Sequence, residues 1–409
     1  MKKTHITMKL LPILAALLTC INVNAYDIEV DNIYYDVNLD DMTASVTSGD
    51  NLYTGNIVIP SSIAYKGREF HVVSLDNISF KNCPDLISVT IRDGIEDIKA
   101  YAFSGSKKLA EVVLPNTLTN LGENSFENCE SLESLEIPNG IKSIPNRCFT
   151  GCRSLSHVNI PQSVTTIEQR AFYFCSSLSH IELPHSLQRI GAEAFEWSGL
   201  VSISIPNSVS TIEAFALGNC LALQNVIFND GNTPLVMLFV SSEDIDLHEG
   251  DFLGASPLES LHIGRFISNI TISEDLNILR INVTKLKTVS FGKYSNKSLD
   301  FTYAQELEEV YCKFTDPSDV TVSFSNKTYL NATLFVPTGT KEKFEKADGW
   351  KNFFSIQEFD MDETAVKAIK QTNGIKQYYN LDGKKPPYPN KGVNIIRSSN
   401  GETHKILIR

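Results

Sequence analysis

One residue pattern returns every 23 positions between Phe80 and Phe228. Its marker residues are Phe80, Phe103, Phe126, Phe149, Phe172 and Phe195, after which one residue drops out and Leu217 takes the place. A fixed period within ~20 to 29 residues over seven copies indicates a leucine-rich-repeat solenoid. Ordering the backbone costs ~1 to 2 kcal/mol of entropy per residue. The apolar side chains that a single copy can bury do not offset this total cost. The copies must therefore stack on one another to fold.

Positions within each copy predict how the chain coils. Counted from the phenylalanine, offset +3 is a small residue and offset +6 is leucine, except that Leu200 comes one place early. Two apolar residues separated by one follow, and this period of two is typical of a half-buried strand. These pairs are Val89/Ile91, Val112/Leu114, Leu135/Ile137, Val158/Ile160, Ile181/Leu183, Ile203/Ile205 and Val226/Phe228. We predict one strand per copy, stacked in parallel ~4.8 Å apart, with irregular or short 3-10 connections and β-rich caps.

The segment from Ala171 to Phe195, AFYFCSSLSHIELPHSLQRIGAEAF, resembles the BspA-like leucine-rich repeat family of bacterial surface proteins. That family's pattern is A-F-x-x-C-x-x-L-x-x-I-x-I-P-x-S-V-x-x-I-G, and the likeness extends, in clear or degraded form, from Ile57 to Phe354. The resemblance implies a leucine-rich-repeat solenoid. It also implies a Bacteroidetes-type surface protein used in adhesion and in binding host or neighbouring-cell proteins.

The N-terminus is typical of a secretion signal. Residues 1–25 contain two early lysines, an apolar run from Leu10 to Leu18, and Val23-Asn24-Ala25 before the expected cleavage. The apolar run is shorter than the ~20 residues of a membrane span, so we expect no integral membrane span. Lipoprotein processing at Cys20 is a rival, although Thr19 fits it less well.

The remaining chain divides into a cap, a solenoid, a linker and a tail. We predict an N-terminal β cap at 26–56, a solenoid at 57–359 that is regular over 80–228 and degenerate over 229–359, a linker at 360–376, and a small β module at 377–409. The tail resembles the C-terminal sorting signals of some Bacteroidetes secreted proteins.

The degenerate part keeps the motif L-x-x-Φ-x-Φ, where Φ is apolar, at Leu258, Leu286 and Leu307. The acidic insertion 241–250 has no calcium-loop pattern and is predicted to be a solvated loop. A short helix is expected at 341–350, and the aromatic pair at 353 and 354 is expected to close the core.

Charge and cysteine usage exclude several classes of function. The net charge of −12 and the lack of a basic cluster argue against nucleic-acid binding. Five cysteines share offset +3 with Ser106 and Ser198, which predicts small buried packing residues. Cys148 and Cys152 occupy different repeat positions, so we predict no metal site.

The sequence contains no nucleophile elbow, H-E-x-x-H, P-loop or dinucleotide fingerprint. We therefore predict no enzymatic activity, no catalytic residues and no cofactor. A hydrolase housed in the irregular repeats after Phe228 remains a rival interpretation.

The better candidate surface is the outward face of the stacked strands. The predicted ligand-binding residues there are Glu136, His157, Asn159, His180 and Glu182. Stacking would make His157 and His180 neighbours, which suggests pH sensitivity. Aromatic platforms typical of sugar binding are missing from these outward positions, which favours a protein ligand, such as host extracellular matrix or another cell's surface protein. The alternatives are an ordinary solvated sheet face and an envelope lipoprotein that binds glycans in nutrient uptake.

Overall fold

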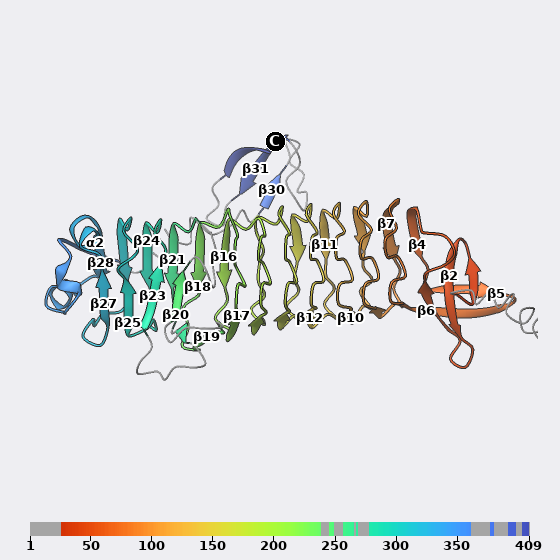
Figure 1. The fold of residues 1–409 in the computed structure, drawn as a ribbon, viewed down its shortest axis with the longest axis horizontal. Helices are drawn as coiled ribbons and strands as arrows, with labels where there is room; N and C mark the ends of the chain where they lie inside the picture. The colour runs from red at the N-terminus through yellow and green to blue at the C-terminus, as the bar shows by residue number, and fades with distance from the viewer. Residues whose placement is uncertain are drawn as a thin grey trace, which may run out of the picture. The chain divides into compact units, whose positions relative to one another are not determined.

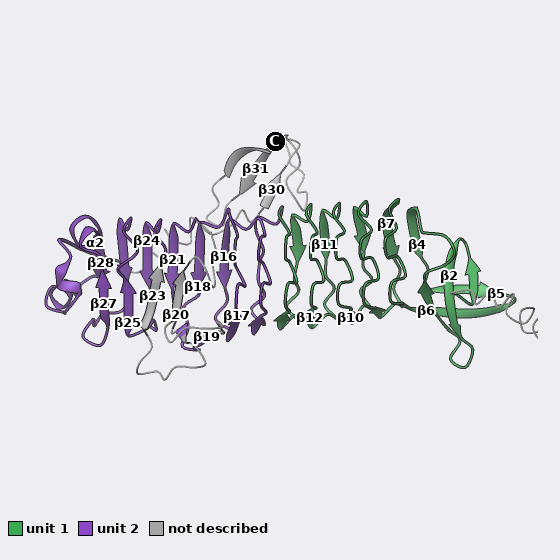
Figure 2. Ribbon diagram, in the orientation of Figure 1, with its two compact units in different colours: residues 1–176 green, residues 177–409 purple. Residues whose placement is uncertain are grey.

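The computed structural model describes residues 26–238, 245–248, 257–265, 267–268, 278–360, 377–379, 392–397 and 403–408. The chain groups into two compact units, 1–176 and 177–409 (Figure 2). The predicted signal segment with Cys20, and residues 361–376 of the predicted linker, lie outside the described residues. Within the described part, no helix has the length and apolar character needed to cross a membrane. The predicted segment boundaries stay predictions.

In the first unit the predicted apolar pairs form parallel strands (Figure 1). These strands are β4 (Gly55–Ile59), β7 (Leu86–Ile91), β9 (Glu111–Val113), β11 (Ser134–Glu136) and β13 (His157–Asn159). Equivalent residues face each other, with Ile57 opposite Val89 and Val89 opposite Val112. Leu135 likewise lies opposite Val158. The predicted parallel strand stack is confirmed.

Each repeat also carries a second, shorter strand that the sequence did not predict. In the first unit these are β8 (Asp97–Ile98), β10 (Asn120–Leu121), β12 (Ser143–Ile144) and β14 (Thr166–Ile167); in the second unit they are β15 (Arg189–Ile190), β17 (Thr211–Glu213), β19 (Leu235–Leu238) and β22 (Ile267–Ser268). They pair in parallel, for example with Ile144 opposite Ile167. Six of these eight strands have only two residues, too few for alternation of polarity to show.

Stacked aromatic rings form the core of the first unit. The rings of Phe80, Phe103, Phe126, Phe149 and Phe172 follow one another at centroid distances of 5.2, 5.1, 5.5 and 5.3 Å. Tyr53 extends the stack beyond Phe80 at 4.3 Å. The repeat phenylalanines therefore need a neighbour on each side, and the cap supplies the first one.

The N-terminal part of the first unit contains a meander and a hairpin of antiparallel strands. β1 (Ile28–Val30), β2 (Ile33–Asn38) and β3 (Thr43–Thr47) form a meander, and β5 (Ser62–Tyr65) and β6 (Arg68–Leu75) form a hairpin. The hairpin turns at Lys66 and Gly67, both with positive φ. β3 pairs in parallel with β6, and β6 pairs with β8, so the meander joins the repeat ladder.

In the second unit the parallel strands continue through the degenerate repeats. One sheet contains β16 (Ser202–Ile205), β18 (Asn225–Phe228), β21 (Ser260–Ile263), β24 (Thr288–Phe291), β26 (Glu309–Cys312), β28 (Thr333–Pro337) and β29 (Ser355–Phe359). Leu261 lies opposite Val289, and Val289 opposite Val310. The degenerate motifs therefore retain the predicted strands, whereas β29 was not predicted.

Two predictions about the second unit are wrong. Residues 245–248 of the predicted solvated loop form strand β20 (Ile245–His248), which pairs in parallel with β23 (Ile278–Asn282). The same sheet continues through β25 (Ser298–Phe301) and β27 (Thr321–Phe324). Residues 179–184, predicted to contain a strand, form none. Ile181 and Leu183 are nevertheless buried there. The spacing of these apolar residues therefore indicated their burial correctly but did not ensure a strand.

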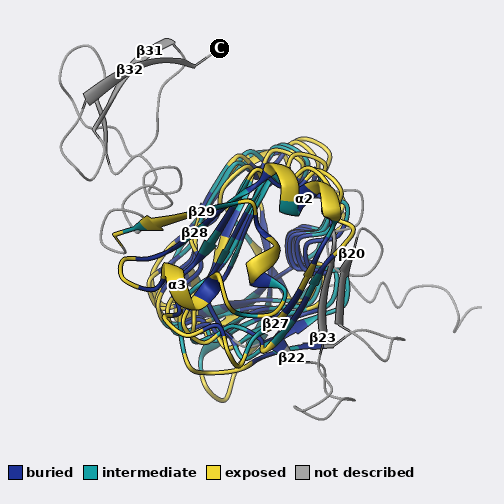
Figure 3. Ribbon diagram, turned by 90° about the vertical axis from the view of Figure 1, so that its left-hand side faces the viewer, coloured by how far each residue is buried: buried dark blue, intermediate teal, exposed yellow. Residues whose placement is uncertain are grey.

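Short helices lie at the C-terminal end of the second unit's coil, facing the viewer in Figure 3. They are α2 (Asn326–Asn331), α3 (Lys341–Phe344) and the 3-10 helix η2 (Trp350–Asn352), so the predicted helix at 341–350 is shorter than expected. Phe353 is buried as predicted, but Phe354 is 80% exposed and does not close the core. A separate antiparallel sheet contains β30 (Gln377–Tyr379), β31 (Gly392–Arg397) and β32 (Thr403–Ile408).

The seven cysteines in the described residues are all buried and free. At offset +3 the side chain is also a hydrogen-bond donor, because Cys129 donates to the carbonyl of Phe103 at 3.2 Å and Ser106 donates to that of Phe80 at 2.6 Å. The predicted packing role is therefore incomplete, since the position requires a donor as well as a small side chain.

Candidate functional site

Three of the predicted site residues lie in the first unit. Glu136 in β11 is exposed and lies opposite Asn159 in β13, which is also exposed. His157 is half-buried, with Nδ1 2.8 Å from Ser156 Oγ. The structure thus brings Glu136 and Asn159 together on an outward strand face.

The other two predicted residues, His180 and Glu182, belong to the second unit. Both are exposed, but they lie in the 179–184 segment that forms no strand. The predicted proximity of His157 and His180 links residues of different units and stays a prediction.

A richer outward face covers the seven-stranded sheet of the second unit. One row of cross-strand neighbours, which we name the outward row, runs through Ser204, Ile227, His262, Ser290, Tyr311, Phe335 and Gln357. These residues alternate with the buried ones along each strand, so they point away from the core. Polar and aromatic side chains therefore meet on one face.

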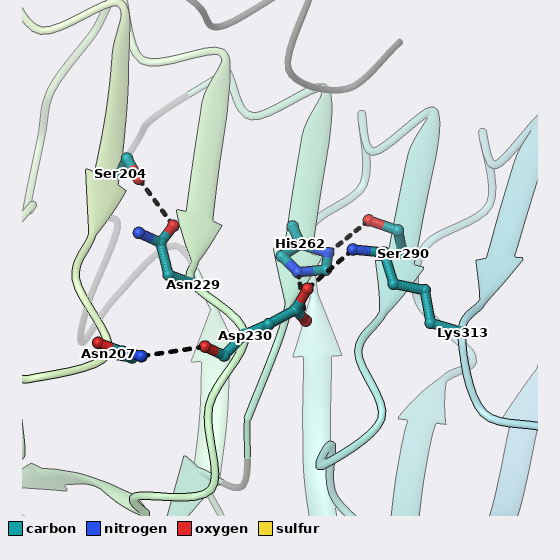
Figure 4. Close-up of polar contacts among 7 residues, drawn as sticks. All are labelled: Ser204, Asn207, Asn229, Asp230, His262, Ser290 and Lys313. Carbon is teal, nitrogen blue, oxygen red and sulfur yellow. Dashed lines mark hydrogen bonds and ion pairs between the residues drawn. The ribbon is translucent and has the colours of Figure 1, made fainter. Parts of the chain in front are cut away.

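A charged cluster lies at the middle of this row (Figure 4). His262 Nε2 lies 3.1 Å from Asp230 Oδ1, and His262 Nδ1 lies 2.8 Å from Ser290 Oγ. Lys313 Nζ donates to the other carboxylate oxygen of Asp230 at 2.9 Å. Asn207 Nδ2 donates to the backbone oxygen of Asp230 at 3.3 Å, which ties the cluster to the preceding turn.

The electrostatics of the cluster favour an ionised Asp230. Burial raises the pKa of this carboxyl group, but hydrogen bonds and charge from His262 and Lys313 outweigh that effect and lower the pKa to about 2. The side chain of Asp230 is 50% exposed, whereas that of His262 is only 13% exposed. The cluster thus presents to solvent an ionised carboxylate that is paired with the Lys313 ammonium group, beside a histidine held by two partners.

An aromatic pair follows the cluster along the row. The rings of Tyr311 and Phe335 stack at a centroid distance of 4.5 Å and an interplanar angle of 9°. Phe359 meets Tyr311 edge-on at 5.8 Å. Burial, followed by the nearby Glu309 carboxylate, raises the pKa of Tyr311 to about 12, and its hydroxyl lies 3.2 Å from Glu309 Oε2. The aromatic residues absent from the outward positions of the regular repeats are therefore present in the degenerate ones.

The sequence did contain a signal for these residues. From Ser204 to Tyr311, each outward position stands four residues after the repeat leucine, as His262 does after Leu258 and Tyr311 does after Leu307. The irregular spacing of those leucines hid the row, because insertions of different length separate the copies. The strand register in the structure shows which residues share it.

Within the described ranges, no group of three or more His, Cys, Asp or Glu side chains has the geometry to hold a metal ion. Asp230 and His262 are accompanied by Lys313, whose ammonium group would repel a cation.

A family model described as the BspA type leucine-rich repeat region matches residues 73–200 and 165–236, in six copies. The sequence matches no curated protein. Among solved structures, a leucine-rich cell surface protein from Faecalibacterium prausnitzii A2-165 is 18% identical, with 83% of this chain and 96% of that chain covered and a TM-score of 0.37. A leucine-rich repeat protein from Bacteroides ovatus ATCC 8483 is 17% identical, with 82% and 100% covered and a TM-score of 0.38.

The pneumococcal vaccine antigen PcpA is also similar, at 16% identity, with 82% of this chain and 98% of that chain covered and a TM-score of 0.38. The family match spans residues 73–236. Together with the parallel ladder of the repeats, it shows that this chain contains a BspA-type leucine-rich-repeat region.

Proposed function

We propose that this protein is exported, displayed at the cell surface, and binds protein ligands as an adhesion module without catalysis. The predicted signal at residues 1–25 supports export. The BspA-type repeat supports a surface role, since proteins with this repeat are associated with adhesion. A solenoid suits such a role because stacked repeats present an extended, regular surface.

The observation that carries the proposal is the pairing of Tyr311 and Phe335 with the Asp230 cluster on one sheet face. Aromatic side chains dominate the energetic centres of protein interfaces, and charged groups at the rim steer association. Here the aromatic pair and the charged cluster are joined through Ser290, which lies opposite both His262 and Tyr311. We infer that a protein ligand lies across β21 to β28.

The test is binding of residues 26–409 to arrays of extracellular-matrix and cell-surface proteins. A Tyr311→Ala/Phe335→Ala variant should lose at least about tenfold in affinity, since aromatic anchors are typical hot spots. Ser202→Ala/Ser204→Ala, on the same sheet, is the matched control and should retain binding. Equal binding by both variants would contradict the assigned face.

The ligand-binding residues predicted from the sequence are tested in the same binding assay. A His157→Ala/His180→Ala/Glu182→Ala variant that lost binding, while the aromatic variant kept it, would move the ligand site to the regular repeats. A complete lack of binding to the arrays would favour a structural role in the envelope.

A second candidate function, hydrolysis, is favoured by the order Ser290–His262–Asp230. A serine, a histidine and a carboxylate in hydrogen-bond sequence form the arrangement of serine hydrolases. Here, however, Nδ1 faces the serine and Nε2 the carboxylate, which reverses the usual roles of the ring nitrogens, and Lys313 shares the carboxylate. Turnover of peptide or ester substrates that is lost in Ser290→Ala would support this function, whereas absence of turnover with both classes of substrate would contradict it.

A further inference from the structure

A shallow hollow of about 780 Å³ lies at the C-terminal end of the second unit, between α2 and η2. Its lining residues are Asn326, Tyr329, Leu330, Lys351, Asn352, Phe353 and Phe354. The helix α2 lies at the end of the coil that faces the viewer in Figure 3. The volume lies within the ~300 to 1,000 Å³ that is usual for small-molecule sites.

One wall of the hollow is apolar and open to solvent. Phe354 is 80% exposed and Leu330 is 56% exposed. The Phe354 backbone is nevertheless fixed, because its N–H donates to the carbonyl of Tyr329 at 3.0 Å. Phe353 beside it is buried, and β29 starts at Ser355, directly after Phe354. A rigid backbone thus holds an aromatic ring in water, where it is available to an apolar surface of a ligand.

The remaining lining residues are polar, and a neighbouring carboxylate balances the charge of the one cation among them. The side-chain amides of Asn326 and Asn352 have no hydrogen-bond partner among the described residues, and each offers two donors and an acceptor. Lys351 is the one lining cation, and its Nζ is paired with Asp348 at 2.5 Å. The hollow therefore combines amide groups with an aromatic face and carries no unbalanced charge.

We propose that this hollow binds a neutral sugar residue of a glycan. A pyranose ring carries hydroxyl groups around its rim, which pair with amides, and C–H groups on its faces, which cover an aromatic ring. A fatty or purely aromatic ligand would leave the amides of Asn326 and Asn352 without partners, which is costly once water is excluded. A sialylated or sulfated sugar would meet one lining cation, Lys351, whose charge Asp348 already balances.

This site lies on different elements from the face proposed for protein ligands. The outward row runs along β16 to β29, whereas the hollow is lined by α2, η2 and the two residues that follow η2. The two proposals can therefore succeed or fail separately.

The experiment applies residues 26–409 to an array of neutral oligosaccharides built from glucose, galactose, mannose and N-acetylglucosamine, with sialylated and sulfated glycans on the same slide. The strongest neutral binder is then titrated calorimetrically. Phe354→Ala should weaken its affinity by at least about tenfold, and Asn352→Ala should also weaken it. Both side chains are exposed, so both variants should keep the thermal midpoint of the parent protein.

Phe335→Ala is the matched control, because it removes an aromatic ring from the sheet face and leaves the hollow intact. Neutral-glycan binding that survives Phe335→Ala and is lost in Phe354→Ala supports the proposal. Absence of neutral-glycan binding, binding of charged glycans only, or unchanged affinity in Phe354→Ala would overturn it. Loss of a protein ligand in Phe354→Ala without any glycan binding would also overturn it, in favour of a protein partner.

Discussion

The thiol of Cys152 donates a hydrogen bond to the carbonyl oxygen of Phe126, one repeat earlier, at 3.0 Å. Cys175 does the same to Phe149 at 3.2 Å. At Ser106, Cys129, Cys152, Cys175 and Cys220, offset +3 therefore links a repeat to the one before it through a buried donor. This explains why cysteine and serine alternate at a position that a purely apolar residue never occupies in the regular repeats.

Cys152→Ser should be tolerated, and Cys152→Ala should not. Serine keeps the donor, as Ser106 shows, so the free energy of unfolding should change by less than about 1 kcal/mol. Alanine leaves the Phe126 carbonyl without this partner and removes buried volume, which should cost ~1 to 3 kcal/mol. Urea unfolding of both variants measures the difference, and equal costs would show that the thiol acts by packing alone.

The protein should lose stability in mildly alkaline solution. Burial raises the pKa of Cys220 to about 11 and that of Cys148 to about 12. Thiols of the unfolded chain titrate near ~8.5, so the unfolded state loses protons first as the pH rises. Each such thiol should lower the free energy of unfolding by up to ~1.4 kcal/mol per pH unit above that value, until its folded pKa is reached.

Urea midpoints at pH 8, 9 and 10 check this dependence. Cys220→Ser should flatten the curve, because serine does not titrate in this range. A midpoint that stays constant between pH 8 and 10 would contradict the expected burial of the thiols.

Arg265 should be needed for the fold of the second unit. It is fully buried and donates to the backbone oxygens of Asn207 at 3.0 Å and Pro206 at 2.9 Å, and also to that of Val209. Burial lowers its pKa to about 10, so keeping the charge has a cost. Removing Arg265 leaves buried carbonyls without their donors, at a cost of ~1 to 3 kcal/mol each. We expect this cost to outweigh the free energy gained by no longer burying the charge.

Thermal unfolding of Arg265→Met should therefore show a net loss of ~2 to 4 kcal/mol. Arg265→Lys should recover little of this loss, because one ammonium cannot reproduce the guanidinium fork. A methionine variant as stable as the parent would indicate that desolvation of the charge dominates.

The Asp230 cluster should make a small, acid-sensitive contribution. The pKa of the folded carboxyl group is about 2, below the ~3.9 of an unfolded aspartate. The ionised carboxylate therefore stabilises the fold fully at pH values above the unfolded pKa. This stabilisation should be lost as the pH falls towards 2. Because the carboxylate is 50% exposed, solvent screening limits the effect to ~1 kcal/mol or less. The difference in unfolding free energy between parent and Asp230→Asn, measured from pH 5 to pH 2, should shrink as acid is added.

Arg147→Asn should stabilise the first unit. Arg147 has a φ of 53°, in the left-handed region, and Asn124 occupies the same position of the preceding repeat with a φ of 56°. A left-handed residue with an ordinary side chain costs ~1 to 2 kcal/mol, whereas asparagine tolerates that conformation better. We expect a gain of ~0.5 to 1 kcal/mol in calorimetric unfolding. An unchanged or lower stability would show that Arg147 makes compensating contacts.

Many features of the fold could be predicted from the sequence because each repeat contacts mainly its neighbours. A fixed period places Val89, Val112 and their equivalents at one height of successive turns, and alternation decides which side chains enter the core. The degenerate repeats followed the same rule at Leu261, Val289 and Val310, since the local motif survived the loss of period.

Other features were decided by the tertiary structure. The outward row joins His262, Ser290 and Tyr311 across insertions of unequal length, so only the strand register brings them together. Arg265 binds carbonyls 56 to 59 residues earlier in the chain, a separation that no repeat period encodes.

Phe354 illustrates the same division at the end of the coil. Phenylalanine is usually a core residue, yet Phe354 is exposed because its neighbour Phe353 fills the core and β29 fixes the direction of the chain. The sequence by itself determined the repeating coil, its inward residues and its strand positions, because these depend on local polarity and on contacts between adjacent copies. The tertiary structure alone decided which irregular segments meet on the outward face and at the C-terminal end, because those contacts depend on how insertions of different lengths are accommodated between stacked strands.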